Sequence, residues 1–285
     1  GLAFRASVNT GFRAPTPGQA NVKEIATNID LVTGDLQLTA TLPPADPISQ
    51  YFGSQPLETE ESLNYSAGIV AQFLDGYTLT VDLFNIEVEN RIALTSRIPI
   101  TADDRTALEA IGLDPGSFRT VRFLGNFFDT ETKGVDIVLS KTWAINGGTL
   151  GMDLSANFTE TEVTKIRDPR AVNREREVEV SDFNPDWRGF LAFNYAGGKW
   201  SGSVRANYYG EWTDAVATQA PPNAFDQTFG EAVLVDVQVN YEVSPWLSLT
   251  VGADNIFDEY PDKDERVGQQ GNGIVYPQFS PFGFS

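Results

Sequence analysis

The chain has 285 residues, a formal net charge of -19 and neither cysteine nor histidine. Without cysteine it has no disulfide, zinc–thiolate site or thiol nucleophile, and without histidine it lacks the commonest general base and metal ligand. With 39 acidic against 20 basic residues, nucleic acid is an unsuitable partner, because phosphate contacts need clustered Lys and Arg. The composition argues against an enzyme and predicts neither a cofactor nor a metal site.

Period-two alternation of apolar and polar residues recurs along the chain and predicts strands whose two faces meet different surroundings. In "VLVDVQVNY", Val233–Tyr241, four valines and the tyrosine share one face, whereas Asp236, Gln238 and Asn240 share the other. Many of these segments reach the roughly 9–11 residues that a tilted strand needs to cross a bilayer, and no stretch has the roughly 18–20 apolar residues of a membrane-spanning helix. About nine segments alternate, near residues 1–10, 62–74, 76–91, 120–142, 148–162, 186–196, 199–212, 231–243 and 247–257.

Short turns alternate with long connections between these segments. The short turns are rich in Gly, Asn, Asp and Pro, and aromatic residues flank each of them. Transmembrane barrels have short periplasmic turns, long extracellular loops and aromatic girdles at the membrane interfaces. The pattern therefore predicts an all-β fold, a transmembrane antiparallel β-barrel with its valine face on lipid. The short turns are Leu74–Tyr77, Ile145–Thr149, Ala196–Lys199 and Val243–Trp246, and the long connections are 11–61, 92–119, 163–185, 213–230 and 258 onward.

Two of the long connections have local patterns of their own. In "TADDRTALEAIGLDPG", Thr101 can cap a short helix that carries Asp103 and Asp104 in its first turn and ends at Gly112. The segment "NREREVEVSDF", Asn173–Phe183, alternates charge and then valine, which predicts a strand that extends beyond the bilayer.

Four segments, in the same order as in the family, resemble TonB-dependent outer-membrane receptors. They are "TGFRAPTPGQA" at Thr10–Ala20, "ESLNYSAGIVAQFLDGYTLTVDLFNIEVENRI" at Glu61–Ile92, "NFFDTETKGVDIVLS" at Asn126–Ser140 and "LTVGADNIFDEYP" at Leu249–Pro261. The resemblance implies a Gram-negative outer-membrane receptor with a 22-stranded barrel. Residues 1–285 would be the carboxy-terminal portion of that barrel, with about nine or ten strands. The plug domain, the TonB-contacting motif and the final strand would lie outside this chain.

The resemblance also implies active uptake of a scarce nutrient, with TonB, outer-membrane lipid and a small-molecule or oligosaccharide ligand as partners. Lumen-facing polar residues toward the extracellular strand ends are the expected ligand contacts, and the candidates are Asn157, Asn207, Tyr209 and Glu211. The ligand class stays open between a carbohydrate, favoured by the ending "SPFGF" at Ser280–Phe284, and a siderophore-like compound. A passive porin and a soluble secreted β protein are the alternatives.

Overall fold

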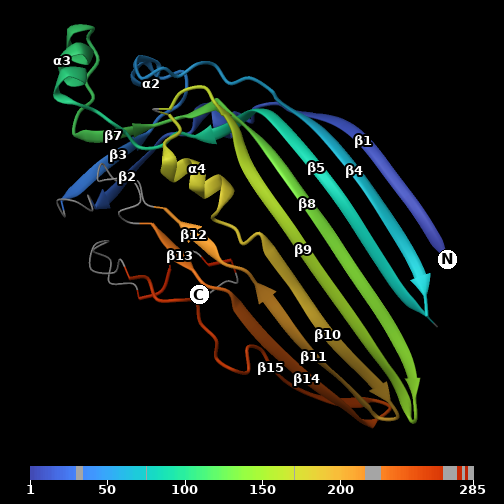
Figure 1. The fold of residues 1–285 in the computed structure, drawn as a ribbon. Coiled ribbons are helices and arrows are strands. Elements are labelled where there is room, and N and C mark those ends of the chain that lie inside the picture. Colours follow the sequence, from blue (N-terminus) through green and yellow to red (C-terminus); the bar gives the residue numbers. More distant parts are fainter. Residues whose placement is uncertain are drawn as a thin grey trace.

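A curved nine-stranded antiparallel sheet forms the largest part of the molecule (Figure 1). The computed structural model describes residues 1–29, 35–74, 76–169, 171–215, 226–265, 275–277 and 280–281. Neighbouring strands of the sheet follow one another in the chain, as in an up-and-down barrel wall. The strands, in order, are β1 (Leu2–Arg13), β4 (Glu60–Phe73), β5 (Tyr77–Leu94), β8 (Leu124–Ile145), β9 (Gly148–Ile166), β10 (Trp187–Gly197), β11 (Trp200–Tyr209), β14 (Ala232–Ser244) and β15 (Leu247–Ala253).

Each of the nine predicted segments corresponds to one strand of this sheet, so the prediction of long antiparallel strands is confirmed. The observed bounds of the nine strands lie within four residues of the predicted ones. The strands β8, with 22 residues, and β9, with 19, are well beyond the length that a bilayer crossing requires. Both continue into the layer of long connections. No helix in the described part of the chain is long and apolar enough to span a membrane.

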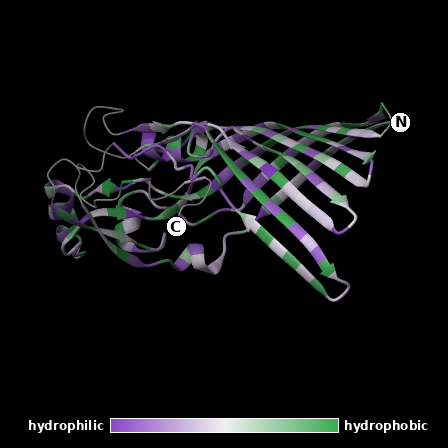
Figure 2. Cartoon of the chain, turned by 90° about the horizontal axis from the view of Figure 1, so that it is seen from below, coloured by the Kyte–Doolittle hydropathy of each residue, from purple (hydrophilic) through white to green (hydrophobic). Residues whose placement is uncertain are grey.

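The two faces of the sheet differ in chemistry. Directly opposite residues of an antiparallel ladder share a face, and the register places Val237 opposite Val204 and Gln238 opposite Ser203. Hydrophobic and hydrophilic residues alternate along the strands in Figure 2. An uncovered apolar surface of this extent is unusual for a water-soluble protein and typical of a lipid-facing wall. Large exposed side chains on the apolar face include Phe4, Val8, Leu83, Leu191, Phe193, Val204, Val239 and Val251.

The short turns gather at one end of the sheet, where aromatic rings form a belt on the apolar face. Phe73 and Tyr77 stack with ring centroids 5.9 Å apart, and Trp143 meets Tyr77 edge-on at 6.1 Å. Trp200 lies 4.5 Å from Tyr241. The predicted aromatic rim at the short turns is confirmed for these residues. Asp75, in the first predicted turn, lies outside the described residues.

The long connections pack together at the other end into a loop layer with its own hydrophobic core (Figure 1). Leu108, Val121, Phe123 and Phe128 are fully buried there, whereas the apolar face of the sheet is open. The sequence did not predict the strands of this layer. Its elements are a four-stranded sheet of β2 (Glu24–Ile29), β3 (Leu36–Thr41), β7 (Phe118–Arg122) and β6 (Ile98–Pro99), a hairpin of β12 (Trp212–Asp214) and β13 (Gln227–Phe229), and helices α1 (Pro17–Asn21), α2 (Pro47–Tyr51), α3 (Ala102–Ala110) and α4 (Arg174–Ser181).

The two predictions for the long connections had different outcomes. The predicted loop helix is confirmed as α3, whose Thr101 and Asp104 form a capping box. The predicted strand extension at Asn173–Phe183 is wrong, because the segment forms α4. Asn173 caps this helix through a hydrogen bond from the Arg176 backbone, and Val178 is buried beneath it. The alternation of charges over so few residues is compatible with either structure, and tertiary packing decides between them.

Candidate functional site

Polar side chains of neighbouring strands are joined across the polar face of the sheet. Arg5 on β1 donates from Nε to Asp82 Oδ1 on β5 over 2.7 Å, and the two side chains form an ion pair. Between them lies Gly68 of β4, which is opposite both residues in the register. A Cβ atom at Gly68 would overlap the Asp82 carboxylate, so the ion pair depends on a residue without a side chain at this position.

Asn157 and Asn207 lie on this polar face, and both amide groups are engaged in hydrogen bonds. Asn157 donates to Asp136 over 2.7 Å and accepts from the Thr159 hydroxyl over 3.0 Å. The Asn207 amide accepts from Arg205 Nε over 2.7 Å and donates to Asp236 over 2.9 Å. These contacts fix the orientation of both side chains, and they compete with any ligand for the same amide atoms.

Tyr209 belongs to the same face, near the loop end of β11. The register places Arg188 of β10 directly opposite Tyr209 on one side and opposite Asn157 on the other. Asn157, Arg188 and Tyr209 therefore occupy neighbouring positions on three successive strands. An amide, a guanidinium and a phenol in one row offer both donors and acceptors to a polar ligand.

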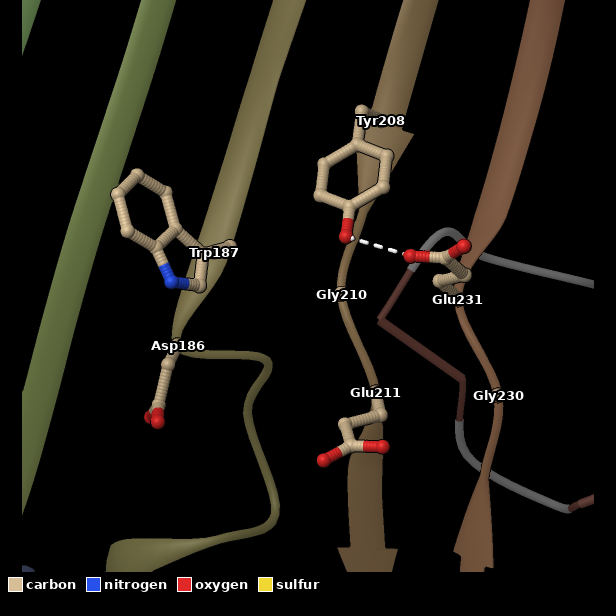
Figure 3. A pocket seen from close by; sticks show the side chains of 7 residues that line it. All are labelled: Asp186, Trp187, Tyr208, Gly210, Glu211, Gly230 and Glu231. Atoms are coloured by element: carbon tan, nitrogen blue, oxygen red, sulfur yellow. Dashed lines mark hydrogen bonds between the residues drawn. The ribbon is translucent and has the colours of Figure 1, made fainter.

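Glu211 lies just beyond the end of β11 and lines a different space, a cavity of about 430 Å³ (Figure 3). Trp187 and Tyr208, which belong to the apolar face of the sheet, are part of its wall. The Tyr208 hydroxyl donates to Glu231 Oε2 over 2.8 Å. The full lining is Asp186, Trp187, Tyr208, Gly210, Glu211, Gly230 and Glu231.

The lining of this cavity combines two aromatic rings with three carboxylates and contains no basic side chain. Partial burial raises the pKa of Asp186, and the nearby carboxylates of Glu160, Asp182 and Glu211 raise it further. Such a wall can accept hydrogen bonds from hydroxyl or ammonium groups while a ring supports an apolar flank. In the described residues no group of three or more acidic side chains is placed to hold a metal ion.

The structure therefore separates the four candidates. Asn157, Asn207 and Tyr209 lie on the polar face, and Glu211 lies with the aromatic residues of the cavity. The sequence analysis missed Trp187, which packs 4.9 Å from Phe158 at the loop end of the sheet. Aromatic residues at the loop ends of the alternating segments were the signal that could have revealed this second belt.

A two-faced antiparallel wall with aromatic belts defines the chain as part of an outer-membrane β-barrel. The chain belongs to the TonB-dependent receptors, because the family model described as "TonB dependent receptor-like, beta-barrel" matches residues 1–256. Members of this family are outer-membrane transporters and receptors, not enzymes. A comparison with curated proteins gives no match.

One solved structure with the same fold is the ferripyoverdine receptor of the outer membrane of Pseudomonas aeruginosa bound to ferripyoverdine. Its sequence is 18% identical to this chain and the TM-score is 0.55. The alignment covers 91% of this chain and 28% of the receptor chain. A mutant of the ferric enterobactin receptor from Pseudomonas aeruginosa is 16% identical with a TM-score of 0.56, over 90% of this chain and 33% of its own. The copper transporter OprC is 12% identical with a TM-score of 0.56, and the alignment covers 90% of this chain and 31% of the OprC chain. The chain thus spans about a third of the length of these structures, and the likeness establishes the fold.

Proposed function

We propose that the receptor to which this chain belongs actively imports a scarce nutrient across the outer membrane, with energy delivered by TonB. The observation that carries the proposal is the match of the family model to residues 1–256. The proposal includes a plug domain outside this chain, because the ligand must be released through the barrel when TonB acts. The chain itself contributes a polar lumen wall and a packed loop layer.

Two ligand classes are proposed, in a definite order. A ferric siderophore is the first, supported by two structures with this fold that are receptors for ferripyoverdine and for ferric enterobactin. A carbohydrate is the second, supported by the row of Asn157, Arg188 and Tyr209 on the polar face, which offers donors and acceptors to sugar hydroxyls. The sequence argument for a carbohydrate used Ser280–Phe284, most of which lies outside the described residues.

Uptake by cells that produce the full-length receptor tests the proposal. Cells with and without TonB are supplied with radiolabelled ferric siderophores or with labelled oligosaccharides, and the accumulated label is measured. We expect accumulation of one class in the strain that has TonB and none in the strain that lacks it. Equal entry in both strains would identify a passive channel and contradict the proposal.

The same assay tests the proposed ligand contacts Asn157, Asn207, Tyr209 and Glu211. Tyr209→Phe, which removes a hydroxyl and keeps the ring, should raise the half-saturating ligand concentration about tenfold if the hydroxyl bonds the ligand. Asn194→Ala is the matched control, since Asn194 donates to Asp153 on the same face but nearer the short turns. Equal effects of the two variants would remove Tyr209 from the ligand site.

A further inference from the structure

The cavity in Figure 3 lies on the lipid-facing side of the sheet, at its loop end. In the register, Trp187 lies opposite Phe158 and Tyr208 lies opposite Val233, on the same face as the exposed Val204. The loop end is opposite the short turns and is the extracellular end of such a barrel. The cavity therefore lies outside the barrel, where the apolar wall meets the headgroups of the outer leaflet.

Two glycines leave the space of this cavity open. Gly210 and Gly230 are part of the lining and contribute no side chain to it. The Gly210 backbone N–H donates to the Trp187 carbonyl oxygen over 2.8 Å, and the Gly230 backbone N–H donates to Asp262 Oδ2 over 2.7 Å. Hydrogen bonds thus fix both backbone segments. The volume of about 430 Å³ falls within the range of roughly 300–1,000 Å³ that is usual for small-molecule sites.

The chemistry of the lining suits a positively charged group. Asp186, Glu211 and Glu231 contribute three carboxylates, and no basic side chain is part of the lining. The Tyr208 hydroxyl donates to Glu231 Oε2 over 2.8 Å, and a carboxylate has two oxygens, so Glu231 can accept further hydrogen bonds. The Trp187 side chain is exposed, and the face of an indole ring attracts cations. Carboxylates and an aromatic ring together are suited to an ammonium group.

Other carboxylates occupy the same face of the sheet at its loop end. Glu87 of β5 lies directly opposite Glu131 of β8, and Glu131 lies opposite Glu162 of β9. Alternation along β5 places them on the face of the exposed Leu83. Like charges directly opposite one another destabilise a sheet, and Lys133, which lies 2.8 Å from Glu131, supplies one positive charge for these three carboxylates. The outer surface above the apolar band therefore favours cationic headgroups over anionic ones.

We propose that the cavity of Trp187 and Tyr208 binds the ammonium headgroup of a lipid in the outer leaflet. The ammonium group donates to the carboxylates of Asp186 and Glu231, and the Trp187 ring covers it. The cavity is continuous with the apolar face through Val233, so the acyl chains of the same lipid can lie along the sheet. This continuity favours a lipid over a soluble amine. The inference rests on the lipid-facing assignment of the sheet and is independent of the imported nutrient.

Native mass spectrometry of the full-length receptor in detergent measures the lipid preference. The receptor is titrated with dioleoyl phosphatidylethanolamine, with its N-acetyl derivative, which lacks the ammonium charge, and with dioleoyl phosphatidylglycerol. We expect phosphatidylethanolamine to bind at least about tenfold more tightly than either of the others, as for a charge-assisted hydrogen bond. Equal binding of phosphatidylethanolamine and its N-acetyl derivative would overturn the proposal. Equally tight binding of soluble glycerophosphoethanolamine would overturn the choice of a lipid.

Variants of the lining locate the binding site. Glu231→Gln should reduce the preference for phosphatidylethanolamine about tenfold, and Trp187→Leu should reduce it about fivefold through the loss of the ring face. Glu211 is left unchanged, because it is also a proposed nutrient contact. An unchanged preference in Glu231→Gln would overturn the site.

Each variant has a matched control. Glu242→Gln removes an exposed carboxylate on the same strand as Val233, but on the polar face near the short turns. Trp200→Leu removes a ring of the aromatic belt at the short turns. Both controls should keep the lipid preference of the unmodified receptor. Loss of the preference in the controls as well would show that the lipid does not bind at this cavity.

Discussion

Adjacent residues of β14 face opposite surroundings, which makes them a sensitive probe of the membrane assignment. Val237 lies opposite Val204 and Ala253 on the apolar face, while Gln238 lies opposite Ser203 and Gly252 on the polar face. A shift of one residue in register would exchange the two environments for the whole strand.

Arginine substitutions at these two positions should therefore differ in cost. Val237→Arg should lower the free energy of unfolding by about 2–4 kcal/mol if the residue lies near the bilayer midplane, because its charge would enter hydrocarbon. Gln238→Arg should change it by less than about 1 kcal/mol, since the side chain stays in the polar lumen. Denaturant unfolding of the receptor in phospholipid vesicles measures both, and equal costs would contradict the assignment of the faces.

Gly68 shows how one small residue supports an ion pair across three strands. Gly68→Ala would push the Asp82 carboxylate away from Arg5, and overpacking of this kind should destabilise the receptor by about 1–3 kcal/mol. In an Asp82→Ala background the same change should cost much less, which a double-mutant cycle measures. Gly151→Ala is the control, because its new Cβ would lie 3.7 Å from the Asn194 carbonyl oxygen and meet no clash.

At the scale of elements, the loop helix α4 carries a half-buried carboxylate, that of Glu179. Burial raises the pKa of Glu179, and Glu175 and Asp214 raise it further, while Arg176 and Arg122 oppose them. A carboxyl whose pKa is higher in the folded state than in the unfolded state binds its proton more tightly when folded. Its contribution to stability is therefore present at low pH and is lost as the pH rises from its ordinary value of about 4.3 through the raised value.

We therefore expect the protection of residues 174–181 against hydrogen exchange to be weaker at a pH above the raised pKa of Glu179 than at a pH below its ordinary pKa. The exchange rates must first be corrected for the intrinsic pH dependence of exchange. Glu179→Gln should remove most of the difference, because the amide does not titrate. Glu177→Gln should retain it, since Glu177 is exposed on the same helix. An unchanged pH dependence in Glu179→Gln would show that another group controls the docking of α4.

At the scale of the whole molecule, the apolar surface and the buried core lie in different places. The sheet exposes its apolar face between aromatic belts, and the buried cluster lies in the loop layer. A soluble protein would place its core against the sheet. The separation indicates that the sheet obtains its apolar environment from lipid and the loop layer obtains it from its own side chains.

Tryptophan fluorescence can verify this separation, because Trp200 lies in the belt at the short turns and Trp212 is 2% exposed within the loop layer. In vesicles that contain brominated lipids, Trp200→Phe should remove part of the lipid-quenched emission. Trp212→Phe should leave that part unchanged, since its ring packs on Phe229 and not on lipid. Equal losses from both variants would place the loop layer in the membrane.

The sequence by itself determined the nine long strands, their order and their two faces, because period-two alternation and short turns are local properties of the chain. It also determined α3, whose cap needs only Thr101 and Asp104. The family resemblance added the outer-membrane class. Of the candidate ligand contacts, alternation placed Asn157, Asn207 and Tyr209 on the polar face but could not show that both asparagine amides are already engaged.

Only the tertiary structure decided the features that join distant segments. The loop-layer sheet pairs β3 with β7 across a long stretch of chain, α4 forms where alternation indicated a strand, and Glu211 lies with the aromatic cavity. The hydrogen bond from Arg122 Nε to the Thr95 carbonyl oxygen also joins distant segments, and no local pattern predicts it. Strand periodicity is written into neighbouring residues, whereas packing among long connections depends on which side chains meet after the chain has folded.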